Sequence, residues 1–210
     1  MQSSNRAGSA EPIESKLFKV AIAGDGMTGK TCLLNRYTKN HYSDNYKPTI
    51  GADFVYKEIL FEGKLVKLQF WDLSGQYAGS KEVTSNFFRG ASGVMICFSL
   101  IDNKSLSHVT GWRQRSSSLL PDNTPCVIVG TKCDLGSMPD ENWSFLCESE
   151  NFDTWFQTSA KSGVGVKESF EGLVKMMLDR EEENREMDGK KGDLLGDLNG
   201  QRERSRPCGC

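Results

Sequence analysis

The chain has 210 residues, a formal net charge of −2 and a hydrophobic fraction of 37%. This length suits one compact domain with a tail, since domains usually hold about 100–200 residues. The small net charge argues against nucleic acid as a partner, and no apolar run reaches the roughly 20 residues of a membrane span. Residues 1–15 are polar and contain no apolar stretch, so we interpret them as a disordered leader rather than a secretory signal.

Short apolar runs predict buried strands, and they alternate with segments of helical character. We expect strands over residues 17–23, 54–60, 65–71, 93–100, 126–130 and 155–158. We expect helices over residues 31–39, 103–118, 140–150 and 164–184. A hairpin signal at residues 61–64 joins the second and third strands. The pattern predicts a three-layer α/β fold, with a six-stranded, mostly parallel sheet, one antiparallel edge strand and helices on both faces.

The loop after the first predicted strand carries the strongest motif. Residues 24–31 (GDGMTGKT) fit G-x-x-x-x-G-K-[ST] and open the first predicted helix. Its glycines let backbone N–H groups converge on phosphate oxygens, and the helix N-terminus faces the same anions. Lys30 can reach the β- and γ-phosphates, and the Thr31 hydroxyl can ligate Mg²⁺. The expected nucleotide-binding residues of this segment are Gly26, Met27, Thr28, Gly29, Lys30, Thr31 and Cys32.

A second motif follows the third predicted strand. Asp72 at the strand end can hold Mg²⁺, usually through water. Gly75 can offer its N–H to the γ-phosphate, and Gln76 carries a donor and an acceptor suited to orienting an attacking water. We therefore expect Gln76, together with Lys30, to be the catalytic residues.

Two further strand-end segments predict recognition of guanine. The Asp134 carboxylate can accept hydrogen bonds from guanine N1–H and its exocyclic NH₂, whereas adenine has neither donor. Such a mismatch can discriminate by about 10⁴-fold or more. The Lys132 stem can cover a base face, and the Ala160 N–H can bond guanine O6. Alone, the string TKCD would suggest an ordinary strand-end loop, but its place after the fifth strand favours a base-binding role. The other residues expected in these two segments are Thr131, Ser159 and Lys161.

These residues closely resemble the Ras superfamily of small GTPases, and within it the Rab family, from Leu17 to about Arg180. Rab-like signatures stand at residues 50–54 (IGADF), 67–72 (KLQFWD) and 87–91 (FFRGA). The resemblance implies the P-loop GTPase fold and binding of GTP or GDP with Mg²⁺. It departs from the family at residues 77–80 (YAGS), where Glu-Arg-Phe usually follows the glutamine, and this stretch is one residue longer.

The resemblance also implies the roles of two switch segments. In the first switch, Thr49 would ligate Mg²⁺ and touch the γ-phosphate only in the GTP state, which makes Thr31, Thr49 and Asp72 the expected metal residues. Tyr42 would pack against the guanine, and Tyr46 would lie over the phosphates. The second switch would run from Asp72 to about residue 88.

A change in composition near residue 180 marks a boundary between two parts of the chain. We expect a small GTPase domain at residues 16–180 and a flexible hypervariable tail at 181–210. Cys208 and Cys210 end the sequence in a C-x-C pattern that resembles Rab geranylgeranylation sites, and two prenyl chains supply stable anchoring. A terminal metal-binding pair is the alternative, although two thiols without histidine make a poor site. We expect the other five cysteines to be reduced, and His41 and His108 to be surface or packing residues.

Three functional hypotheses follow. The first is a slow, monomeric GTP hydrolase that acts as a membrane-anchored switch in vesicle trafficking, on the cytoplasmic face of intracellular membranes and cycling with the cytosol. Its partners would be an exchange factor, a GTPase-activating protein, a GDP-dissociation inhibitor and effectors, with no nucleic acid. The second is a GTP-loaded scaffold that hydrolyses negligibly because its second switch is altered. The third, an ATP-dependent kinase, is disfavoured by Asp134 with Ala160 and by the lack of a lid segment.

Overall fold

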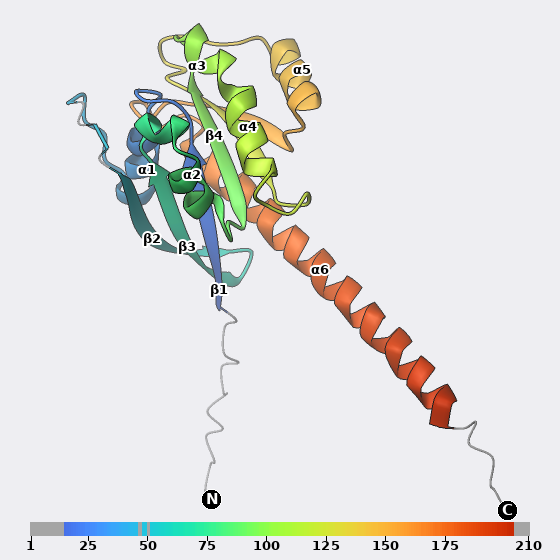
Figure 1. The fold of residues 1–210 in the computed structure, drawn as a ribbon. Helices are drawn as coiled ribbons and strands as arrows, with labels where there is room; N and C mark the ends of the chain where they lie inside the picture. Colours follow the sequence, from blue (N-terminus) through green and yellow to red (C-terminus); the bar gives the residue numbers. More distant parts are fainter. Residues whose placement is uncertain (1–14, 46–47, 50, 204–210) are drawn as a thin grey trace, which may run out of the picture.

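The computed structural model describes residues 15–45, 48–49 and 51–203, without the side chains of residues 78–79, 81 and 188–203. Six strands form one sheet in the order β2-β3-β1-β4-β5-β6 (Figure 1). The strands are β1 (Ser15–Ala23), β2 (Ala52–Phe61), β3 (Lys64–Leu73), β4 (Gly93–Ser99), β5 (Cys126–Thr131) and β6 (Thr154–Thr158). β2 pairs antiparallel with β3, and the other neighbouring strands pair in parallel. This confirms the predicted sheet.

The β2–β3 hairpin turns at Glu62 and Gly63, which have positive φ values of 48° and 78°. Left-handed residues at both central positions are typical of the type I′ turn, whose twist matches that of the flanking strands. The register that follows pairs Ala52 with Leu73 and Asp53 with Asp72. The start of β2 therefore lies beside the end of β3, at the edge where the parallel strands end.

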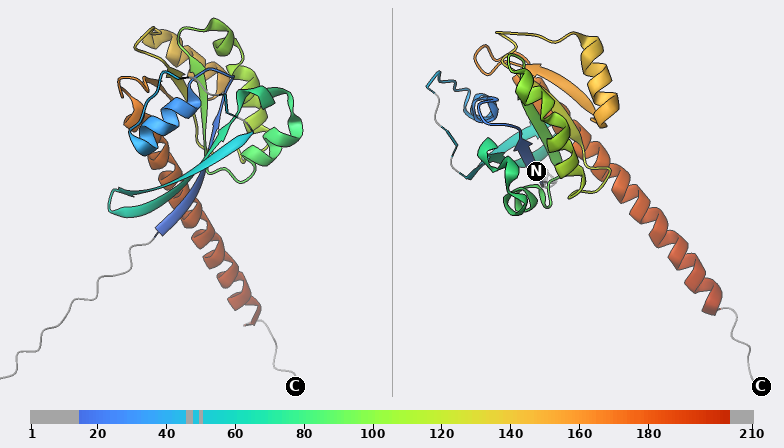
Figure 2. Two further views of the ribbon diagram at one scale, coloured as in Figure 1. Left: turned by 90° about the vertical axis from the view of Figure 1, so that its left-hand side faces the viewer. Right: turned by 45° about the horizontal axis from the view of Figure 1, so that its top comes forward.

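Helices cover both faces of the sheet (Figure 1, Figure 2). On one face, α1 (Lys30–Lys39) and α6 (Val166–Glu203) contribute to a first buried cluster. On the other face, α2 (Lys81–Phe88), α3 (Asn103–Ser107), α4 (Val109–Ser117) and α5 (Asp140–Glu150) contribute to a second. All seven residues of β4 between them are buried, as expected for a central parallel strand.

Aromatic packing holds the first cluster together. Phe170 of α6 stacks on Tyr37 of α1, with ring centroids 4.1 Å apart, and meets Phe70 of β3 edge-on at 5.2 Å. Cys97 is buried in the first cluster and Cys126 in the second. All cysteines within the described residues are free thiols. Within the same residues, no helix is both long and apolar enough to cross a bilayer.

The helical segments differ from the sequence-based expectation in several places: the helix expected over residues 103–118 is divided at His108 into α3 and α4, and residues 75–79 form a 3₁₀ helix that was not expected. α2 was not expected; it begins after Ser80, whose side chain accepts a hydrogen bond from the Val83 N–H and so caps the helix. α6 continues to Glu203, although we expected a helix ending near residue 184 and then a flexible tail. Glu181 makes ion pairs with Lys16 and Arg185, so part of the charged segment is tied to β1 and to its own helix. Our expectations for residues 1–14 and 204–210, and for the domain boundaries, stay predictions.

The packing of Phe170 predicts its contribution to stability. Because Phe170 is fully buried between Tyr37 and Phe70, Phe170→Ala should lower the free energy of unfolding by about 3–5 kcal/mol in urea denaturation. Phe145 of α5 is 72% exposed, so the matched Phe145→Ala variant should change it by no more than about 0.5 kcal/mol. Equal losses in the two variants would contradict this account of the core.

Candidate functional site

The loop between β1 and α1 has a backbone that depends on glycine. Gly24 has a φ of 137°, and a Cβ there would fall 2.1 Å from the Cys97 carbonyl oxygen of β4. Gly29 stands at the N-cap of α1 with a φ of 90°, and no side chain in the described part of the chain caps that helix. Since the N–H groups of a first helical turn lack partners within the helix, the start of α1 is left open toward an anion.

Lys30 lies at the centre of this loop. Its side chain is only 5% exposed, and its Nζ donates hydrogen bonds to the carbonyl oxygens of Gly24 (2.8 Å) and Asp25 (2.6 Å). Burial lowers the pKa of Lys30, while the nearby carboxylates of Asp72 and Asp25 oppose that shift. The loop therefore wraps around a buried ammonium group.

A cluster of oxygen atoms lies beside the lysine. Thr31 Oγ1 donates a hydrogen bond to Asp72 Oδ2 and lies 2.9 Å from Thr49 Oγ1. Asp72 is buried, and its Oδ1 has no hydrogen-bond partner among the described residues. Burial raises the pKa of Asp72, and the Thr31 hydrogen bond and the Lys30 charge partly offset this. A buried carboxylate with an unpaired oxygen next to two hydroxyls fits Mg²⁺, which prefers oxygen ligands.

The end of β3 reaches the same loop through Gly75. A Cβ on Gly75 would fall 1.9 Å from the Gly26 nitrogen, so only glycine permits this approach. Gln76 follows it in an exposed position, within the 3₁₀ helix Gly75–Gly79. This helix accommodates the unusual sequence after Gln76: the Ser80 N–H donates to the Tyr77 carbonyl, and Tyr77 packs on the second buried cluster.

A cavity of about 570 Å³ joins these groups. This is within the range of about 300–1,000 Å³ that is typical of small-molecule sites. Tyr42 lies in its wall and donates a hydrogen bond to Asp44, which raises the pKa of Tyr42 to about 12. Tyr46 lies outside the described residues. The predicted site residues that line the cavity are Gly26, Met27, Gly29, Lys30, Thr31, Cys32, Tyr42, Thr49, Gly75, Gln76 and Lys132.

The end of β5 contacts the loop of residues 24–31, which we call the phosphate loop after its predicted role. The Thr131 hydroxyl is buried, within hydrogen-bond distance of the Thr28 carbonyl oxygen and 3.0 Å from that of Phe98. Lys132 Nζ donates to the Met27 carbonyl oxygen at 2.9 Å. The structure thus brings Thr28 and Thr131 to the site as loop supports behind its wall.

Apart from Lys132, the predicted base-reading residues lie at the same end of the sheet but outside the cavity wall. Asp134 is exposed on the loop that follows β5. The Cys133 N–H beside it donates to the Thr158 carbonyl oxygen at the end of β6 (3.1 Å), so the two base-reading loops adjoin. Ser159 is buried, and its Oγ accepts a hydrogen bond from the Ser162 N–H.

Comparison with known proteins agrees with this geometry. The Ras family model matches residues 19–179. The chain is 36% identical over 176 residues to the Ras-related protein Rab7 of Cenchrus ciliaris, which covers 80% of this chain and 85% of that protein. It is 34% identical over 203 residues to Rab7 of Prunus armeniaca, and the match covers 92% of this chain and 97% of that protein. It is 34% identical over 174 residues to the Ypt/Rab-type GTPase ypt7 of Pyricularia oryzae, and the match covers 79% of this chain and 84% of that protein.

The chain belongs to the Ras family. Within that family it is a Rab-type small GTPase, which confirms the resemblance drawn from the sequence. The roles of individual site residues stay proposals, because similarity over the whole chain does not test them one by one.

Some residues that shape the site of this Rab-type GTPase escaped the sequence analysis. Arg36 of α1 donates hydrogen bonds to the carbonyl oxygens of Ala160 (2.7 Å) and Lys161 (2.5 Å), and so holds the β6–α6 loop. His108 and Trp112 contact the phosphate loop through Asp25. A lone arginine, histidine or tryptophan on a helix gives no local signal of a partner more than 80 residues away.

Proposed function

We propose that this chain is a membrane-anchored switch that binds GTP and GDP with Mg²⁺ and hydrolyses GTP slowly. The observation that supports it best is the convergence of Lys30, Thr31 and Thr49 on one cavity, with the buried Asp72 carboxylate hydrogen-bonded to Thr31. Similarity to Rab7 and to Ypt/Rab-type GTPases supports a role in vesicle trafficking. The expected partners are an exchange factor, a GTPase-activating protein, a GDP-dissociation inhibitor and effectors.

The phosphates would bind to the open start of α1 and to the loop N–H groups of residues 26–32. An ammonium group has three donors, and two of those on Lys30 bond loop carbonyls at 2.8 and 2.6 Å. Among the described residues, the third has only the Thr28 hydroxyl as a partner, at 3.4 Å. Lys30 can therefore give this donor to a phosphate oxygen without losing the contacts that shape the loop.

Thr31, Thr49 and Asp72 would hold Mg²⁺, which supplies positive charge that offsets the charge of the phosphates. The Asp72 Oδ1 atom has no hydrogen-bond partner among the described residues, so it is free to bind either the ion or one of its waters. Thr49 stands just before β2, in the segment that the resemblance assigns to the first switch. Its contact with Thr31 ties that segment to the phosphate loop.

For hydrolysis, Gln76 would orient the attacking water with its amide, and Lys30 would stabilise charge on the phosphate oxygens. A Cβ built on Gly26 meets no atom of the described residues within 4 Å, so space is left beside the loop for water or for an arginine from an activating protein.

For the base, Asp134 and the Ala160 N–H would select guanine, Lys132 would cover its face, and Thr131, Ser159 and Lys161 would support these contacts.

The nucleotide claim predicts what the purified protein carries. Protein purified with Mg²⁺ and then denatured should release about one molecule of GDP or GTP per protein molecule, as measured by chromatography.

Asp134→Ala should reduce the preference for guanine over adenine nucleotides by at least about 100-fold, since the carboxylate that accepts hydrogen bonds from two guanine donors is lost. Asp122→Ala, on an exposed loop away from the cavity, is the control and should keep it. Recovery of mainly adenine nucleotides from the unaltered protein would refute guanine specificity.

The role of Gln76 predicts a hydrolysis defect. In single-turnover assays of bound GTP, Gln76→Leu should hydrolyse about 100-fold more slowly, the scale of a lost water-positioning group, and should keep its nucleotide affinity. Gln69→Leu is a matched control, because Gln69 bonds Tyr56 on β2 and lies outside the cavity. Equal rates for the Gln76→Leu variant and the unaltered protein would remove Gln76 from the mechanism and favour the GTP-loaded scaffold.

The membrane proposal concerns Cys208 and Cys210, which lie outside the described residues. Replacing both with serine should move the protein from the membrane to the soluble fraction of fractionated cells, because stable anchoring needs two lipid signals. The double control Cys133→Ser with Cys147→Ser removes thiols within the folded domain and should leave the distribution unchanged. Unchanged membrane association of the Cys208 and Cys210 variant would exclude prenylation as the anchor.

A further inference from the structure

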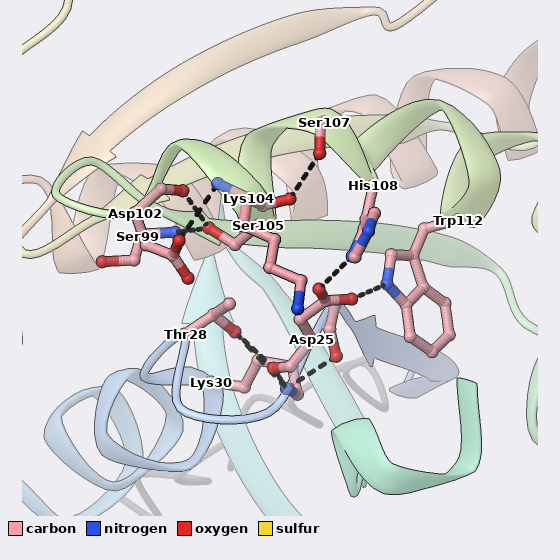
Figure 3. A network of polar contacts seen from close by, with 11 residues as sticks. Asp25, Thr28, Lys30, Ser99, Asp102, Lys104, Ser105, Ser107, His108 and Trp112 are labelled. Carbon is pink, nitrogen blue, oxygen red and sulfur yellow. Dashed lines mark hydrogen bonds and ion pairs between the residues drawn. The ribbon is translucent and has the colours of Figure 1, made fainter. Parts of the chain in front are cut away.

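Asp25, the second residue of the phosphate loop, makes contacts in two directions (Figure 3). Its main-chain oxygen accepts hydrogen bonds from Lys30 Nζ (2.6 Å) and from the Thr28 hydroxyl (2.9 Å). Its carboxylate faces α3 and α4: Trp112 Nε1–H donates to Oδ1 at 2.9 Å, and His108 Nδ1 lies 2.5 Å from Oδ2. One residue thus joins the lysine of the loop to a helix on the opposite face of the sheet from α1.

We propose that Trp112 and His108 are positioning residues for the phosphate loop. By fixing the Asp25 carboxylate, they hold the Asp25–Gly26 peptide in the place where the loop receives the phosphates, and so slow the release of nucleotide. This inference rests on the proposed function, because it requires that the loop binds a nucleotide.

The peptide that they hold is already confined on another side. A Cβ on Gly75 would fall 1.9 Å from the Gly26 nitrogen and 2.3 Å from the Asp25 carbonyl carbon. The second switch therefore packs directly against the Asp25–Gly26 peptide. With Gly75 against its backbone and α4 holding its side chain, Asp25 has its position set by two elements outside the loop.

Trp112 is suited to this role because it cannot move easily. Its side chain is 1% exposed, within the second buried cluster. Trp71 and Trp143 differ from it, since their Nε1 atoms have no hydrogen-bond partner among the described residues. The indole of Trp112 is therefore a rigid donor aimed at a loop that lies 87 residues earlier in the chain.

The negative charge of Asp25 gives a second reason why both Trp112 and His108 contact its carboxylate. A carboxylate behind a phosphate-binding loop repels the incoming phosphates unless its charge is offset. The Trp112 N–H and the His108 ring both contact the carboxylate, and Lys30 lies on the far side of the same residue. Hydrogen bonds to a charged group are stronger than those between neutral groups, so loss of either donor weakens both the placement and the charge balance.

The test measures the release of a fluorescent GDP analogue from the full chain with Mg²⁺. Trp112→Phe keeps an aromatic ring and removes the donor, so release should become about tenfold faster, the scale of one hydrogen bond to a charged group. Trp143→Phe is the matched control: it also replaces a buried indole, but one whose N–H has no partner among the described residues, so release should stay unchanged. His108 is about half exposed, so His108→Ala should fold normally and release about threefold faster.

A spectroscopic measurement separates positioning from general stability. The indole N–H signal of Trp112 in nitrogen-edited NMR spectra should shift between the GDP form and a form with a non-hydrolysable GTP analogue, and should shift again in His108→Ala. The Trp143 signal should stay in place in both comparisons. Equal release rates in Trp112→Phe and Trp143→Phe, with release in His108→Ala unchanged, would overturn the inference. Failure of the unaltered protein to hold guanine nucleotide would instead overturn the proposed function itself.

Discussion

The buried ammonium group of Lys30 is the interaction on which the rest of the site depends. A charge that is removed from water must find hydrogen-bond partners, and Lys30 finds them in the carbonyl oxygens of Gly24 and Asp25. Those carbonyls can face inward only because Gly24 has no side chain to meet the Cys97 carbonyl of β4. The loop carbonyls are therefore held by contacts within the protein itself, and a loop that is ordered by folding does not have to be ordered again when a ligand binds.

Sheet topology brings the oxygens proposed to bind Mg²⁺ close to this lysine. β1 and β3 run in parallel with Ile22 opposite Asp72, so Asp72 stands level with the last residues of β1, just before the phosphate loop. The antiparallel hairpin then returns β2 along β3, with Asp53 opposite Asp72, which places the segment containing Thr49 above the end of β3. Thr31, Thr49 and Asp72 are far apart in the sequence, and they meet because parallel and antiparallel pairing share one strand.

The sequence predicts the parts of this arrangement that depend on local order and leaves out those that depend on long-range contacts. Apolar runs that end in Gly24 or Asp72 mark strand ends, and strand ends mark the ligand edge of a parallel sheet. No comparable pattern connects Asp25 with Trp112, and His108 was expected to be a surface or packing residue because a single histidine on a helix has no periodic signal. The charged composition after residue 180 suggested a flexible tail, but ion pairs such as Lys16 with Glu181 form only once β1 and α6 lie side by side.

The contacts of Asp25 and Gly75 indicate which side of the site is more constrained and which is less constrained. The Asp25–Gly26 peptide touches Gly75 on one side, while the Asp25 side chain is held by two donors. Packed interiors do not deform continuously, so a displacement at this contact must be taken up by the less constrained partner. The 3₁₀ helix that begins at Gly75 is short, no side chain caps it, and Gln76 within it is exposed. We therefore expect the segment after β3 to yield before residues 24–31 do, which is the order of stiffness that the proposed switch would need in order to hold its nucleotide while it moves.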